Sequence, residues 1–204
     1  MRAGCARAIH VMRRLALPGV LVLCNPLAVA ADDAGHWYLN PGVGGITPDK
    51  PWGGSGSAIL YELDVGKNLS AAWSGELAVN GAPLSDRSAA GDIGLYSGAI
   101  NLLRVFHRNA AFAPYVLLGA GVTHVAPPAG TRRENRTEFM LQPGLGAIGR
   151  FWESADGSRT LALRPDIKVR WTHGWAHAPG NPVDVLYVLG VTFSFGSGAP
   201  RTAH

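Results

Sequence analysis

Residues 160–171 read TLALRPDIKVRW, and their side chains separate by parity into two chemically different sets. The apolar set is Leu161, Leu163, Pro165, Ile167, Val169 and Trp171, and the charged set is Arg164, Asp166, Lys168 and Arg170. Because successive side chains of a β-strand point to opposite faces, this stretch predicts a strand with one apolar and one charged face. A transmembrane β-barrel needs this pattern, since lipid covers its outside and its lumen is polar. We therefore predict that residues 160–171 form one membrane-spanning strand.

The first 30 residues have the features of a secretory signal peptide. Four arginines accompany an apolar run over residues 15–24, and residues 28–30 form a small-residue cleavage site. The apolar run is shorter than the roughly 20 residues of a transmembrane helix. A lipoprotein signal is an alternative, but it would need a small residue before Cys24, where this chain has Leu23. We expect residues 1–30 to be removed, residues 31–196 to form one barrel and residues 197–204 to form a tail.

Removal of the signal peptide changes the charge balance and the cysteine content. The chain has 18 basic and 14 acidic residues, and loss of the four signal-peptide arginines leaves 14 basic ones. A formally neutral mature chain gives no reason to expect a nucleic-acid partner. Cys5 and Cys24 both lie in the signal peptide, so the exported chain has no thiol for a disulfide, a nucleophile or a metal site. We predict no cofactor and no metal.

Seven further segments alternate in the same way, at residues 36–46, 57–65, 71–80, 92–106, 112–125, 137–152 and 183–195. Most reach the roughly 9–11 residues that a tilted strand needs to cross a bilayer. The connections after the second, fourth and sixth segments are short and the others are mostly longer, which is typical of outer-membrane barrels. In residues 92–106, Asn101 falls on the apolar parity, so we place a β-bulge near Gly98. The predicted fold is all-β, an eight-stranded antiparallel up-and-down transmembrane β-barrel.

The charged side chains on the inward parity are the main candidate functional residues. Unpaired charges in a confined lumen are costly, and eight strands leave an interior that side chains just fill. We therefore expect an ion-pair network that plugs the lumen, as a structural core or as a gate. Because consecutive strands usually neighbour each other, Glu138 and Asp184 should lie closest to the cations of residues 160–171. The predicted lumenal residues are Glu62, Asp64, Glu76, Asp92, Arg104, Glu138, Arg150, Arg164, Asp166, Lys168, Arg170 and Asp184.

Two other motifs carry weaker chemical signals. Gly144, Gly146 and Gly149 match G-x-G-x-x-G, but no helix follows that could bind a dinucleotide, so we interpret them as inward glycines beside large lumenal side chains. His173 and His177 lie four residues apart in a segment rich in glycine and proline, without the glutamate of a zinc-protease motif. We interpret both histidines as loop residues without a metal.

Several segments together resemble the OmpA-like transmembrane β-barrel family. The resemblance implies an eight-stranded barrel in the outer membrane of the Gram-negative envelope, with surface loops and with outer-membrane lipid and lipopolysaccharide as its surroundings. Family members often continue into a peptidoglycan-binding domain, whereas only GSGAPRTAH follows the predicted barrel, so cell-wall tethering is not expected. The segments that carry the resemblance are YELDVGKNLSAAWSGEL, NLLRVF with FAPYVLLGAGV, QPGLGAIGRFW, LRPDIKVRW and LGVTFSFG.

These observations favour a non-enzymatic protein that supports envelope integrity or acts as a surface antigen, with unidentified loop ligands. A porin-like channel for small solutes is one alternative, because the lumen is charged. An outer-membrane lipid A deacylase is another, with His173 or His177 as the catalytic histidine. Enzymes of that type carry a serine two residues after the histidine for nucleophilic catalysis, whereas this chain has Trp175 there.

Overall fold

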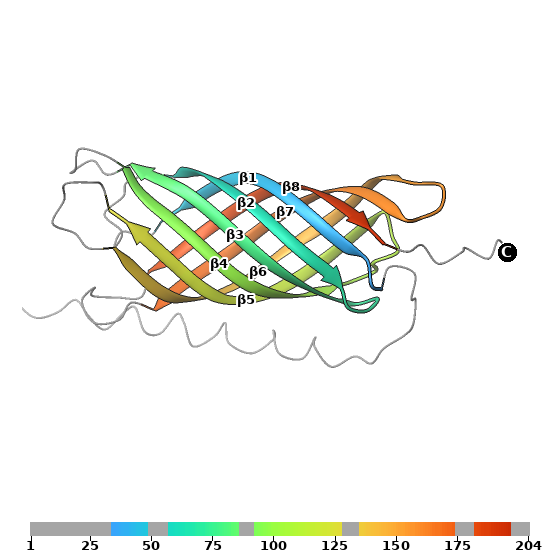
Figure 1. Cartoon of the computed structure of the whole chain (residues 1–204), viewed down its shortest axis with the longest axis horizontal. Coiled ribbons are helices and arrows are strands. Elements are labelled where there is room, and N and C mark those ends of the chain that lie inside the picture. The colour runs from blue at the N-terminus through green and yellow to red at the C-terminus, as the bar shows by residue number, and fades with distance from the viewer. Residues whose placement is uncertain (1–33, 49–56, 86–91, 128–134, 174–181, 197–204) are drawn as a thin grey trace, which may run out of the picture.

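The computed structural model describes residues 34–48, 57–85, 92–127, 135–173 and 182–196. Each strand pairs antiparallel with the next, and the last pairs with the first, so the sheet closes into a barrel of tilted strands (Figure 1). The predicted fold is confirmed. In the described part of the chain, no helix is long and apolar enough to cross a membrane. The strands are β1 (Trp37–Thr47), β2 (Ala58–Asn68), β3 (Trp73–Ser85), β4 (Asp92–Val105), β5 (Phe112–Ala126), β6 (Arg136–Glu153), β7 (Arg159–His173) and β8 (Val183–Phe195).

The two ends of the barrel differ in their connections. Residues 69–72, 106–111 and 154–158 join strands at one end, which we name the short-connection end. Residues 48–57, 86–91, 127–135 and 174–182 join strands at the other, the long-connection end. The predicted signal peptide at 1–30 and the predicted tail at 197–204 lie outside the described residues.

Side chains alternate between the lumen and the outer face as the sequence pattern predicts. β8 is the most regular strand, with every residue of odd number from Val183 to Phe195 exposed on the outside. β7 follows the same rule, and its charged residues from Arg164 to Arg170 are buried in the lumen. The outward positions of β1, β2 and β3 are likewise apolar except near strand ends, at Thr47 and Lys67, so the middle of the outer face is apolar.

Two predicted strand boundaries and one predicted bulge are wrong. β2 continues through Lys67 to Asn68, beyond its predicted end at residue 65, and β3 continues to Ser85, beyond its predicted end at residue 80. The bulge predicted near Gly98 is absent, because β4 keeps an unbroken register with both β3 and β5. Asn101 therefore points into the lumen by ordinary alternation. The register shift lies instead in β6, between Arg150 and Trp152.

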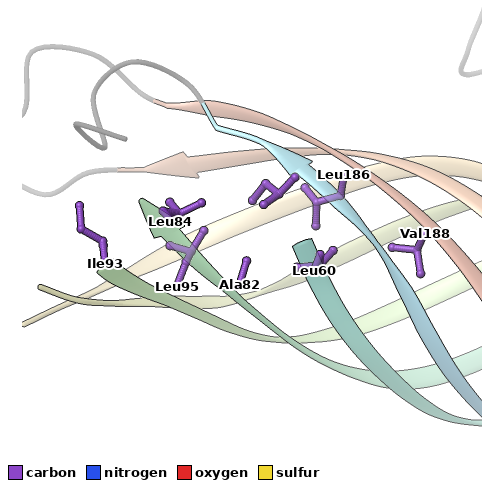
Figure 2. Packing of buried hydrophobic residues seen from close by; sticks show 8 residues of the cluster. Leu60, Ala82, Leu84, Ile93, Leu95, Leu186 and Val188 are labelled. Atoms are coloured by element: carbon purple, nitrogen blue, oxygen red, sulfur yellow. The ribbon is translucent and has the colours of Figure 1, made fainter. Parts of the chain in front are cut away.

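Apolar side chains fill the lumen at the long-connection end. They come from the ends of five strands and point towards one another inside the wall (Figure 2). All are nearly or fully buried, and we name this layer the apolar cap. The members of the apolar cap are Ile46, Leu60, Ala82, Leu84, Ile93, Leu95, Leu186 and Val188.

Candidate functional site

The middle of the lumen holds a group of buried charged residues, which we name the charged layer. β7 supplies the cations and one acid, and the other acids come from β2, β3 and β8. These positions face inward because each lies on the parity opposite to the apolar outer band. The members of the charged layer are Glu62, Asp64, Glu76, Arg164, Asp166, Lys168, Arg170 and Asp184.

Arg164 lies at the centre of the charged layer and is 1% exposed. Its Nη1 and Nη2 donate to Oε2 and Oε1 of Glu76 at 2.8 and 3.1 Å, which is the bidentate geometry that makes arginine–carboxylate pairs strong. Its Nε donates to the hydroxyl of Tyr115 at 2.7 Å. Glu76 also accepts from the Tyr38 hydroxyl at 3.0 Å and from Asn101 Nδ2 at 2.9 Å. Five strands, β1, β3, β4, β5 and β7, are thereby joined across the lumen.

A second contact lies nearer the long-connection end. Lys168 Nζ donates to Glu62 Oε1 and lies 3.7 Å from Asp166 Oδ2. Asp166 Oδ2 is also 3.4 Å from Arg164 Nε, so this carboxylate bridges the two cations of its own strand. Asp64 Oδ2 lies 3.8 Å from Arg164 Nη1. Four carboxylates therefore surround two cations in this part of the lumen.

The third contact joins neighbouring strands. Arg170 and Asp184 are cross-strand partners in the β7–β8 register, and Nε and Nη2 of Arg170 donate to Asp184 Oδ2 at 3.0 and 2.9 Å. Arg170 Nη1 donates to the hydroxyl of Ser97 on β4 at 2.6 Å. The pair thus connects one wall of the barrel to the opposite one.

One set of carboxylates approaches the spacing of a metal site. Glu62, Asp64 and Asp166 each bring an oxygen within 4.8 Å of the others. The ammonium of Lys168 already touches Glu62 and adjoins Asp166, so the protein supplies positive charge to these acids. We interpret the set as part of the ion-pair network.

The prediction for Arg104 is wrong. This residue lies on the outward parity of β4, and its guanidinium carbon is 5.2 Å from the ring centroid of Trp73 and 5.9 Å from that of Phe106. Such contacts between a guanidinium and aromatic rings near a strand end are typical of the membrane–water interface. There the arginine stem packs against apolar surface while the charged group stays close to water. Asp92 is also placed wrongly by the sequence, since it is exposed at the first position of β4. Both errors follow from taking the apolar parity of β4 as its outward face, whereas those side chains are buried in the lumen.

Glu138 and Arg150 face inward but lie apart from the charged layer. Glu138 is half-buried on β6, and none of the described residues forms an ion pair with it, so the prediction that it is a close partner of the β7 cations is wrong. Arg150 lines a cavity of about 30 Å³ at the short-connection end. Its Nη2 donates to the carbonyl oxygen of Arg108 at 2.7 Å. The β7 cations instead reach across the lumen to Glu62 and Glu76.

The uncharged partners of the network are not among the lumenal residues predicted from the sequence. Tyr38, Tyr115 and Asn101 each hydrogen-bond a member of the charged layer, and all three are buried. Their signal was inward parity together with a hydrogen-bonding group, which a search restricted to charged residues overlooks. Ser97 belongs to the same class.

Glycines leave room for these large side chains, as predicted for two of the three in the G-x-G-x-x-G match. A Cβ atom at Gly146 would collide with Asp166 and with the Tyr115 hydroxyl, and one at Gly144 would crowd Lys168. The prediction is wrong for Gly149, which has only a carbonyl oxygen at 3.8 Å from such a Cβ and lies on the outward parity.

Comparison with known proteins identifies the fold. No protein-family model matches the sequence, and no curated protein matches it. The solved structure of neisserial surface protein A matches with a TM-score of 0.62 at 12% identity and covers 79% of this chain and 98% of that one. The N-terminal β-barrel domain of Pseudomonas aeruginosa OprF matches with a TM-score of 0.54 at 15% identity, over 79% and 98% of the two chains. The chain has the OmpA-like outer-membrane barrel fold.

A third match extends this OmpA-like barrel fold to the outer membrane protein OprG of Pseudomonas aeruginosa. Its TM-score is 0.52 at 14% identity, over 82% of this chain and 99% of that one. At such low identities the likeness concerns the fold. The chemistry of this OmpA-like barrel must therefore be argued from its own residues.

Among the histidines weighed for catalysis, His173 is exposed at the end of β7 of the OmpA-like barrel. Its ring meets that of Trp171 edge-on, with centroids 6.3 Å apart. His177 and Trp175 lie outside the described residues. An imidazole against an indole edge, outside the lumen, is an arrangement that suits the membrane interface.

Proposed function

We propose that this protein is a non-enzymatic barrel of the Gram-negative outer membrane, exported by a cleaved signal peptide, which supports envelope integrity or surface interactions through its longer connections. The observation that carries the proposal is the opposite character of the two sides of the wall. Outside, Ile100 and Leu118 are 73% and 61% exposed, whereas inside, Lys168 and Arg170 are 0% exposed. Apolar surface of this extent, continuous around the barrel, is stable against lipid and unstable against water.

The lumen supports a closed barrel within this proposal. The charged layer crosses it from wall to wall, and the apolar cap adjoins that layer, with Leu186 opposite Lys168 and Val188 opposite Asp166 in the β7–β8 ladder. A constriction lined by apolar side chains excludes water, and paired charges leave no unpaired charged group to bind a passing ion. A lumen occupied by paired charges and apolar side chains favours a structural role over transport.

Membrane location and orientation can be tested together with single cysteines, because both natural cysteines lie in the predicted signal peptide. Arg136→Cys marks the long-connection end and Ala155→Cys marks the short-connection end, and both positions are exposed. Intact cells treated with a membrane-impermeant maleimide should label only Arg136→Cys, while lysed cells should label both. Labelling of Ala155→Cys alone on intact cells would show that the barrel has the opposite orientation. Absence of the protein from the outer-membrane fraction would refute the proposal.

A small-solute channel is the second candidate, favoured by the buried charges that line the lumen. Planar-bilayer recordings distinguish it, since a closed barrel should give no steady conductance as wild type. Arg164→Ala and Arg170→Ala each remove one barrier, and we expect conductance to rise clearly only when Arg170→Ala is combined with Leu84→Ser in the apolar cap. Steady conductance of the wild type that changes with either single variant would favour the channel.

The lipid A deacylase alternative has a direct test. Purified barrel is incubated with lipopolysaccharide, and lipid A is weighed by mass spectrometry. Under our proposal no acyl chain is lost. Acyl loss that occurs with wild type and disappears with His173→Ala would favour the hydrolase.

A further inference from the structure

Two cations and three aromatic rings alternate along the outer face of strands β1 to β4, at the short-connection end of the barrel. Trp37 and Trp73 begin β1 and β3, whereas Lys67 and Arg104 are the penultimate residues of β2 and β4. The strand register pairs Trp37 with Lys67 and Trp73 with Arg104. Phe106 follows two residues after Arg104. We name these five residues the cationic rim.

The two cations of the rim contact aromatic rings and no acid. Lys67 Nζ is 5.2 Å from the ring centroid of Trp37, and the Arg104 guanidinium lies over Trp73 and Phe106. Neither cation forms an ion pair with a residue that the structure describes, and Arg104 Nε has no hydrogen-bond acceptor there. A cation over an aromatic face keeps its charge and its free N–H groups. The described residues thus leave both charges of the rim without a counter-charge.

The surroundings of the rim match the order of groups in one leaflet of a membrane. Towards the middle of the wall, the next outward residues are Val65, Leu77 and Leu102, which are apolar and exposed. Tryptophans at a strand end are typical of the membrane–water interface. A ligand that lies along this face therefore meets hydrocarbon contacts first and cations at the edge, as the acyl chains and the head group of a phospholipid would.

The acids of the barrel indicate which head group fits. In the half of the wall nearer the short-connection end, the described outward residues of β1 to β5 include no acid, and neither do the connections 69–72 and 106–111. The ammonium of a zwitterionic ethanolamine head group would find no carboxylate there, whereas an anionic head group brings only negative charge. The connection from β6 to β7 differs, because Glu153 and Asp156 lie beside Arg159 in the chain.

We infer that the cationic rim binds anionic phospholipid of the inner leaflet, with phosphate groups at Lys67 and Arg104 and acyl chains along the apolar wall. The inference rests on the proposed function, because the orientation proposed there places the short-connection end at the periplasmic leaflet. Basic residues at a membrane surface attract anionic lipids by charge. The rim thereby selects the lipids that surround one side of the barrel.

The test compares two phospholipids with the same acyl chains, anionic phosphatidylglycerol and zwitterionic phosphatidylethanolamine. Protein purified from the outer-membrane fraction is mixed with equal amounts of both in a mild detergent, and native mass spectrometry counts the bound molecules of each. The wild type should retain phosphatidylglycerol in preference. Lys67→Gln and Arg104→Gln should each lower that preference about fivefold, and the double variant should abolish it.

Two controls separate the rim from general effects of charge and folding. Arg159→Gln removes an exposed outward cation at the same end, next to the acidic connection, and it should keep the preference of the wild type. Lys67→Arg keeps the charge and should keep the preference as well, whatever the yield of folded Lys67→Gln.

Equal retention of the two lipids by the wild type would overturn the inference, and so would a preference that survives in the double variant. A loss of preference in Arg159→Gln as large as in Lys67→Gln would also overturn it, because the rim would then have no special role. Any of these results in a barrel recovered from the outer-membrane fraction leaves the proposed function intact.

Discussion

Replacement of Glu76 by glutamine is expected to destabilise the barrel by about 3 kcal/mol. The variant Glu76→Gln keeps the size of the side chain but removes the carboxylate that accepts both Nη1 and Nη2 of Arg164. Loss of one partner of a buried ion pair costs about 3–5 kcal/mol, because a charge stays buried without its counter-charge. The lower value applies here, since Asp64 and Asp166 remain 3.8 and 3.4 Å from the guanidinium of Arg164.

A double-mutant cycle separates the ion pair from other effects of the substitution. Arg164→Met leaves the Glu76 carboxylate buried, whereas the double variant removes both charges together. The double variant should therefore cost about 2–3 kcal/mol less than the sum of the two single variants. Urea titration of barrels folded in lipid vesicles gives the unfolding free energies, and an unchanged slope shows that the surface exposed on unfolding is the same.

Glu138→Gln is the matched control, because Glu138 faces inward on β6 but pairs with no charged side chain in the described part of the barrel. Its cost should stay within about 0.5 kcal/mol. If Glu76→Gln costs no more than Glu138→Gln and the cycle shows no coupling, the lumen is hydrated and the argument from a dry ion pair is refuted.

Three further predictions concern the outer face, a turn and the apolar cap. Leu189→Arg should cost about 2–4 kcal/mol in the same urea titrations, because Leu189 is exposed to lipid at the centre of β8, whereas Leu189→Ile should cost little. Hydrogen bonds from Ser154 and Ser158 lower the pKa of Asp156 to about 2, so its charge adds stability at neutral pH that is lost as the pH falls from about 4 through that value. The stability difference between wild type and Asp156→Asn should close over that interval, and a constant difference would contradict the assignment. Leu186→Ala should cost about 2–5 kcal/mol, since Leu186 is fully buried, and a loss under 1 kcal/mol would mean that the apolar cap is loosely packed.

The sequence predicted the facing of side chains best in strands whose outward residues are apolar and whose inward residues are polar or charged. Between Leu161 and Trp171 of β7 and throughout β8 every outward residue is apolar, and the inward residues of β7 from Arg164 to Arg170 carry charge, so parity alone assigns these side chains. β4 lacks this contrast, because Leu95 and Leu103 are buried inside the barrel while Ile100 faces out. An apolar residue can thus lie on either side of this strand. The rule that lumenal residues are polar fails where apolar side chains pack against one another inside the barrel, as those of β4 do.

Ion-pair partners were predictable only between adjacent strands. Arg170 and Asp184 face each other directly in the β7–β8 ladder, and pairing of neighbours in sequence suggested that contact. Arg164 instead reaches Glu76 on β3, which is four strands away around the barrel. Contacts across a lumen depend on the barrel radius, the strand stagger and the length of each side chain, and a parity pattern contains none of these quantities.

The apolar cap is built entirely from strand residues, such as Leu60, Leu84 and Leu186, so its packing does not depend on the residues that connect the strands. Changes in the length and composition of those connections should therefore leave the apolar cap intact. A foreign epitope inserted within residues 174–181 should cost the barrel little stability, and the barrel is in this respect a display scaffold.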